Sequence, residues 1–75
     1  MRVLDVLTVL FCRNYGCEPE DVVLTATLDE LNITSHEREH MATFLEEMYG
    51  VIIDRDTLNG FETVEDVVGF VEDSF

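Results

Sequence analysis

Two histidines four residues apart are the first feature of this sequence with evident chemistry. His36, Glu37 and His40 follow the order His-Glu-x-x-His, in which two imidazoles on one helix face bind zinc and the glutamate acts as general base. Two observations count against this site: the pattern lies in the first helical turn after Thr34 rather than deep within a helix, and no third ligand is obvious, although Glu62 lies at a conceivable distance in sequence. A chain this short also has little room for a substrate cleft. We therefore predict no catalytic residue and no metal ligand, and keep a zinc-dependent hydrolase as a third hypothesis.

The remaining residue types that bind metals are not spaced for a known site. Cys12 and Cys17 match no common zinc or redox motif. Asp54, Asp56 and Glu65 approach the calcium-loop pattern, but a leucine stands at the fifth position and the glycine is displaced by one. With no export signal, we expect two free thiols in a reducing cytoplasm.

The charge of the chain is the strongest global signal. Seventeen carboxylates oppose four basic residues, all arginine, for a formal net charge of −13. Such a chain repels phosphate backbones, which excludes nucleic acid as a partner, and is steered toward basic patches on other proteins. The apolar stretch near the N-terminus is interrupted by Asp5 and is too short to span a bilayer. We expect a cytoplasmic monomer that does not bind membranes.

Hydrophobic periodicity predicts a small all-α domain. Seventy-five residues make one domain at most, so we expect residues 1–75 to fold together. Apolar residues three and four apart indicate helices, which we predict over residues 3–14, 35–49, 56–59 and from 64 onward. The fold class is therefore a four-helix bundle with a long first loop and a short third helix.

Two sets of apolar residues are expected to complete the core. In the long loop, where a short helical turn is expected near 20–23 or 29–32, they are Val22, Leu24, Leu28, Leu31 and Ile33. In the helix from residue 35, they are Met41, Phe44, Leu45, Met48 and Tyr49. The valines after residue 63 keep a helical spacing despite their β-branched side chains, and Thr63 with Asp66 supplies a start signal.

Ser35 stands at a helix start with a clear signal. Thr34 followed by Glu37 fits a capping box, in which each side chain satisfies a backbone N–H of the other residue. The box makes Ser35 the first helical residue. We expect its hydroxyl to be exposed to solvent.

The order of these elements, with several short motifs, resembles acyl and peptidyl carrier proteins. In that family a glycine and an acidic pair precede valine after the first helix, leucine-glycine-x-aspartate-serine-leucine surrounds the attachment site, and threonine-valine opens the last helix. The similar segments here are Arg13–Val22, Leu28–Ser35, Leu45–Ile53 and Phe61–Val67. The likeness extends over nearly the whole chain.

The resemblance implies a phosphopantetheine carrier. Ser35 would receive 4′-phosphopantetheine from coenzyme A, and the thiol of that arm would hold acyl or aminoacyl groups in fatty-acid, polyketide or nonribosomal peptide biosynthesis. Expected partners are a phosphopantetheinyl transferase and acyl-processing enzymes with basic docking patches. The residues at the family's partner face are His36, Glu37, Glu39, His40, Thr43, Glu46 and Glu47.

Several positions depart from the family pattern. Thr34 replaces the usual aspartate, His36 the usual leucine and Asn32 the usual glycine. Glu39 and Thr43 stand where apolar contacts are common. The alternative hypothesis is therefore a carrier-fold interaction module that is never modified.

Overall fold

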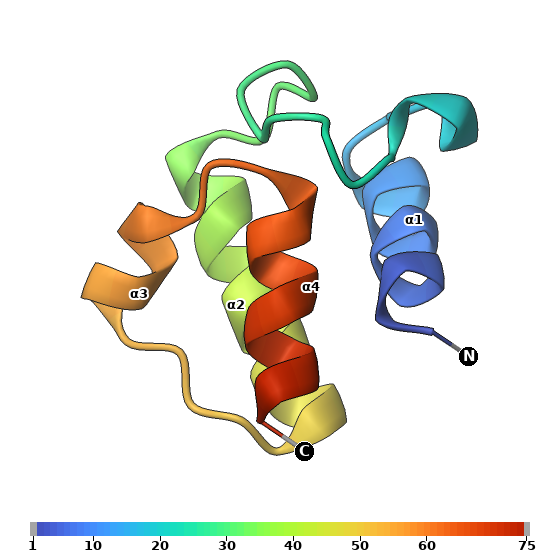
Figure 1. Ribbon diagram of the computed structural model, residues 1–75. Coiled ribbons are helices and arrows are strands. Elements are labelled where there is room, and N and C mark those ends of the chain that lie inside the picture. Colours follow the sequence, from blue (N-terminus) through green and yellow to red (C-terminus); the bar gives the residue numbers. More distant parts are fainter. Residues whose placement is uncertain (1, 75) are drawn as a thin grey trace.

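Four α-helices and a long loop make up residues 2–74, the part of the chain that the computed structural model describes (Figure 1). No strand forms within these residues; a single bridge joins Thr27 to Thr63. The predicted all-α four-helix fold with a short third helix is confirmed. The elements are α1 (Val3–Asn14), the 3-10 helix η1 (Pro19–Asp21), α2 (Ser35–Tyr49), α3 (Arg55–Gly60) and α4 (Val64–Asp73).

One hydrophobic core connects all four helices and the loop. Leu7 and Phe11 of α1 are fully buried, as are Met41 and Leu45 of α2. The valine face predicted for the last helix is also buried: Val64, Val67, Val68 and Val71. No helix within residues 2–74 has the length and apolar character needed to cross a membrane.

Two residues assigned to the core from the sequence lie outside it. Leu24 is 39% exposed and Met48 is 52% exposed, so both predictions are wrong. Leu24 lies in a turn, and its backbone carbonyl accepts a hydrogen bond from the N–H of Glu65 at 3.0 Å. Met48 lies nearly two turns beyond Met41, close to the end of α2, where the core no longer covers it. Two small residues that the sequence pattern did not assign to the core, Ala26 and Ala42, are buried.

The short helices begin slightly earlier than predicted. The turn expected near residues 20–23 is η1, with Pro19 at its first position, where the missing N–H of proline costs nothing. Helix α3 starts at Arg55 because the side chain of Asp54 accepts a hydrogen bond from the N–H of Thr57 at 2.7 Å. Helix α2 ends as predicted at Gly50, whose φ of 70° is left-handed.

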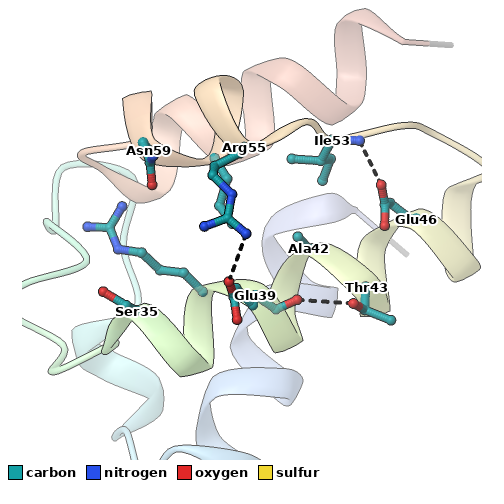
Figure 2. A pocket seen from close by; sticks show the side chains of 10 residues that line it. Ser35, Glu39, Ala42, Thr43, Glu46, Ile53, Arg55 and Asn59 are labelled. Atoms are coloured by element: carbon teal, nitrogen blue, oxygen red, sulfur yellow. Dashed lines mark hydrogen bonds and ion pairs between the residues drawn. The ribbon is translucent and has the colours of Figure 1, made fainter.

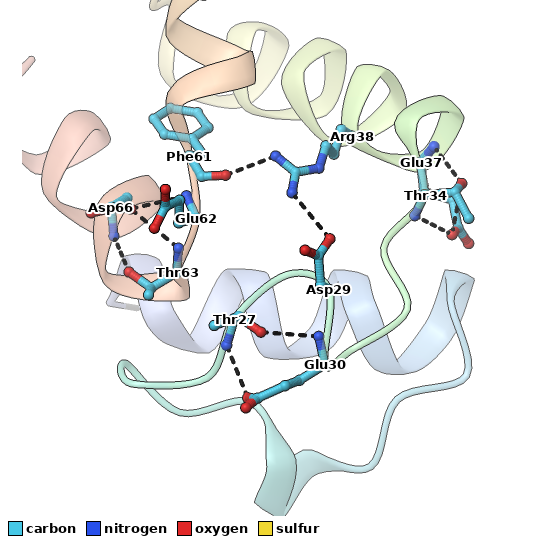
Figure 3. Close-up of polar contacts among 10 residues, drawn as sticks. All are labelled: Thr27, Asp29, Glu30, Thr34, Glu37, Arg38, Phe61, Glu62, Thr63 and Asp66. Atoms are coloured by element: carbon cyan, nitrogen blue, oxygen red, sulfur yellow. Dashed lines mark hydrogen bonds and ion pairs between the residues drawn. The ribbon is translucent and has the colours of Figure 1, made fainter.

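The long loop is ordered by backbone pairing with the start of α4. The N–H of Leu28 donates to the carbonyl of Glu62, and the N–H of Val64 donates to that of Ala26, both at 2.9 Å. Within the loop, Thr27 and Glu30 bond reciprocally, each side chain to the other's N–H (Figure 3). The segment leading to α2 is therefore held by the residues at the start of α4 and by hydrogen bonds within the loop.

The N-terminal cap of α4 should make the stability of the protein depend on pH in the acidic range. Asp66 accepts hydrogen bonds from the N–H groups of Glu62 and Thr63, which lower the pKa of its carboxyl. Because the carboxyl of Asp66 has a lower pKa in the folded than in the unfolded protein, its ionisation stabilises the fold at pH values above the unfolded pKa of about 3.9. That stabilisation is lost as the pH falls through the pKa of the folded protein. We expect the stability advantage of wild type over Asp66→Asn to shrink on acidification below about pH 4.

Urea denaturation of both proteins from neutral pH down through that range measures this advantage. Glu65→Gln, on the same exposed turn but outside the cap, is the matched control. An advantage of wild type over Asp66→Asn that stays constant with pH would contradict the assignment.

Candidate functional site

The capping box predicted at the start of α2 is present and fixes the position of Ser35 (Figure 3). The N–H of Glu37 donates to Thr34 Oγ1 at 3.3 Å, and the N–H of Thr34 donates to Glu37 Oε1 at 3.0 Å. Ser35 is the first residue of the helix and is exposed, as predicted. Its hydroxyl makes no hydrogen bond within residues 2–74, whereas that of the chain's other serine, Ser74, donates to the carbonyl of Phe70.

The approach to Ser35 is shaped by a left-handed residue between two buried ones. Asn32 has a φ of 59°, a conformation that asparagine tolerates better than most residues. Its neighbours Leu31 and Ile33 are buried, and the N–H of Ile33 donates to the carbonyl of Leu28 at 3.0 Å. Asparagine can therefore take the place of the glycine that carrier proteins usually have here.

Substitutions at Asn32 should separate the backbone requirement from the side chain. We expect Asn32→Ala to cost about 1 kcal/mol, because alanine resists positive φ, and Asn32→Gly to remain close to wild type. Urea titrations of both variants give the two free energies of unfolding. Equal losses in the two variants would show that the asparagine side chain, rather than the backbone conformation, matters at this position.

Arg38 connects three segments around the start of α2. Its Nη1 donates to the carbonyl of Phe61 at 2.7 Å, and its Nη2 lies 3.7 Å from Asp29 Oδ1 (Figure 3). The loop, α2 and the link between α3 and α4 are thus held together one turn from Ser35. Sequence reasoning missed this residue, although an arginine in so acidic a chain was a usable signal.

A groove between α2 and α3 begins at Ser35 (Figure 2). Its volume is about 430 Å³. Buried Ala42, Ile53 and Leu58 contribute its apolar lining. Polar side chains also line it, among them Glu39 and Arg55.

The residues predicted to face partners lie on two sides of α2. Glu39, Thr43 and Glu46 line the groove. His36, His40 and Glu47 are exposed along a different stripe, with His40 about one turn after His36 and Glu47 about two turns after His40. Of these, His36 and Glu47 make no side-chain polar contact within residues 2–74. Glu37 is engaged in the helix cap.

His40 is tied to the end of α1. Its Nδ1 lies 2.6 Å from Tyr15 Oη, which also donates to the carbonyl of Glu37 at 3.2 Å. Burial, with the charge of Glu37, raises the pKa of Tyr15 to about 12, so the phenol stays protonated at neutral pH. Within residues 2–74 no three His, Cys, Asp or Glu side chains gather as a metal site. The structure thus brings neither Glu62 nor another described residue to the two histidines as a third ligand.

A family profile described as a phosphopantetheine attachment site matches residues 5–71. The chain belongs to the phosphopantetheine-binding carrier family. The resemblance inferred from its motifs is confirmed. A search of curated proteins gave no match. Domains of this family carry covalently attached 4′-phosphopantetheine and are not themselves catalytic.

The described residues of this carrier domain fit such a group. A phosphodiester is stabilised at a helix N-terminus, where backbone N–H groups and the helix dipole favour negative charge. Helix α2 offers this setting together with an exposed, unbonded hydroxyl on Ser35. The adjoining groove leaves room for an arm to lie along α2.

Proposed function

We propose that this chain carries acyl or aminoacyl groups as thioesters on a 4′-phosphopantetheine arm attached to Ser35. The observation that carries the proposal is the exposed, unbonded hydroxyl of Ser35 at the first residue of a capped helix, in a domain that matches the family profile. When bound, the arm supplies a thiol for thioester formation. The chain itself acts as a support and not as an enzyme.

The residues around Ser35 suit presentation rather than activation. A serine hydroxyl is a weak nucleophile unless a base removes its proton, and no described side chain hydrogen-bonds to Ser35. The modifying transferase must therefore provide the base. The chain holds the hydroxyl away from its own core, through the Thr34–Glu37 cap and the backbone conformation of Asn32.

The electrostatics support protein partners with basic surfaces. A net charge of −13 attracts positively charged docking patches and accelerates encounter. The exposed stripe of His36, His40 and Glu47 and the groove residues Glu39, Thr43 and Glu46 are the surfaces we assign to the transferase and the acyl-processing enzymes. Both cysteines are free thiols, which is consistent with action in the cytoplasm.

Two substitutions beside Ser35 favour the second candidate, an unmodified interaction module. Threonine at position 34 keeps the cap but removes a carboxylate, and His36 presents an exposed imidazole where carrier proteins usually have leucine. Both changes lie on the surface that a transferase must contact.

Intact-mass measurement distinguishes the two candidates. The purified chain is incubated with coenzyme A, magnesium and a promiscuous phosphopantetheinyl transferase, beside a known carrier domain as positive control. We expect a gain of one phosphopantetheine, which fragmentation locates on Ser35 rather than Ser74. Modification of the control carrier alone would favour the interaction module.

A further inference from the structure

The groove beside Ser35 combines a small apolar floor with charged walls. Ala42, Ile53 and Leu58 are buried at its base. Two of the chain's four basic residues, Arg38 and Arg55, line this one groove in a protein of net charge −13. Glu39 and Glu46 line the same groove, so its walls carry charges of both signs beside Ser35 and suit polar groups.

An ion pair spans the groove from α2 to α3. Arg55 Nη2 lies 3.8 Å from Glu39 Oε1, and Figure 2 shows the two side chains facing each other. The side chains are 81% and 58% exposed. Water therefore hydrates both charges, and an exposed pair of this length is weak enough to exchange partners.

The far part of the groove is also polar. Glu46 Oε2 accepts a hydrogen bond from the N–H of Ile53 at 2.8 Å, which joins α2 to the segment before α3 (Figure 2). An aliphatic chain lying in the groove would remove water from Glu39 and Arg55 without giving them hydrogen bonds, and that desolvation opposes the gain from burying methylenes. A cargo with its own donors or acceptors would replace the lost water.

We propose that this groove accommodates the amide-bearing arm and a short polar acyl group, and that it excludes a long aliphatic chain. The inference rests on the proposed attachment at Ser35 and narrows the cargo to acyl groups with hydrogen-bonding or charged substituents. Glu39 and Arg55 are then specificity-determining residues.

The test compares four cargoes on the same serine. The transferase loads the chain from acetyl-, octanoyl-, succinyl- or β-alanyl-coenzyme A, and intact mass confirms loading before any other measurement. We expect octanoyl and acetyl forms to have Tm values within about 4 °C, since burying even two methylenes would raise Tm by more. We also expect succinyl or β-alanyl cargo to shift the amide NMR signals of residues 39–43 and 55 more than octanoyl does.

A variant in which the two charged groove residues Glu39 and Arg55 are replaced by apolar ones provides the converse test. In Glu39→Val/Arg55→Leu we expect the Tm of the octanoyl form to exceed that of the acetyl form by more than about 4 °C. Glu72→Val, on the exposed side of α4 and outside both the groove and the stripe, should behave as wild type. The comparison within wild type needs no substitution, so it stands even if the double variant fails to fold.

The outcomes separate the two proposals. No loading of wild type contradicts attachment at Ser35, and the cargo inference falls with it. Normal loading with a stabilising octanoyl chain in wild type overturns the cargo inference alone. Normal loading with no groove response to either polar cargo also overturns it, as does a double variant that is folded and loaded, by intact mass, but not stabilised by octanoyl.

Discussion

Ser35→Ala is expected to abolish phosphopantetheine attachment completely. The substitution removes the one hydroxyl at the start of α2 that is both exposed and unbonded, while alanine remains compatible with the first helical turn. The Thr34–Glu37 cap does not involve the Ser35 side chain, so the fold should be unaffected. Intact mass after incubation with transferase and coenzyme A measures the loss.

The second serine of the chain provides the matched control. Ser74 follows α4 and donates its hydroxyl to Phe70, and Ser74→Ala should be modified at the wild-type rate. Circular dichroism melts of both variants confirm that they fold. Mass gained by folded Ser35→Ala would place the attachment elsewhere.

Phe11→Ala should cause the largest loss of stability among single core substitutions. Phe11 is fully buried in α1, and its ring lies 5.7 Å from that of Tyr15. Truncating a buried phenylalanine costs about 3–5 kcal/mol, whereas a domain of this length has a total stability of roughly 4–11 kcal/mol. The variant should therefore lose a large share of its free energy of unfolding, which urea denaturation would measure.

Met48→Ala is the appropriate comparison for this loss. The sequence pattern placed Met48 in the core, but the residue is 52% exposed, and surface substitutions usually change stability by less than about 0.5 kcal/mol. Similar losses for Phe11→Ala and Met48→Ala would contradict the observed core.

Helix ends could be predicted from the sequence because their signals are local. Thr34 with Glu37, and Thr63 with Asp66, each satisfy backbone groups within three residues, so no knowledge of the rest of the fold is needed. Gly50 similarly ends α2 through its own backbone conformation. The exposure of Ser35 followed from the first of these caps.

Contacts between distant segments could not be predicted in this way. Periodicity counts Leu24 and Met48 as apolar without showing whether another element covers them, and it overlooks a small residue such as Ala42 that is buried by close packing. The Arg55–Glu39 ion pair joins two different helices. Recognising that Glu39 belongs to a groove, and not to the stripe that contains His40, required the positions of both helices.

The pairing of the long loop with residues 62–65 has a consequence for biosynthesis. Because Ala26 and Leu28 hydrogen-bond to Val64 and Glu62, the stretch that orients Ser35 depends on residues translated after it. A ribosome-bound fragment ending before α4 lacks these partners. The nascent chain should therefore become a substrate for phosphopantetheine attachment only once residues 62–65 have emerged from the exit tunnel.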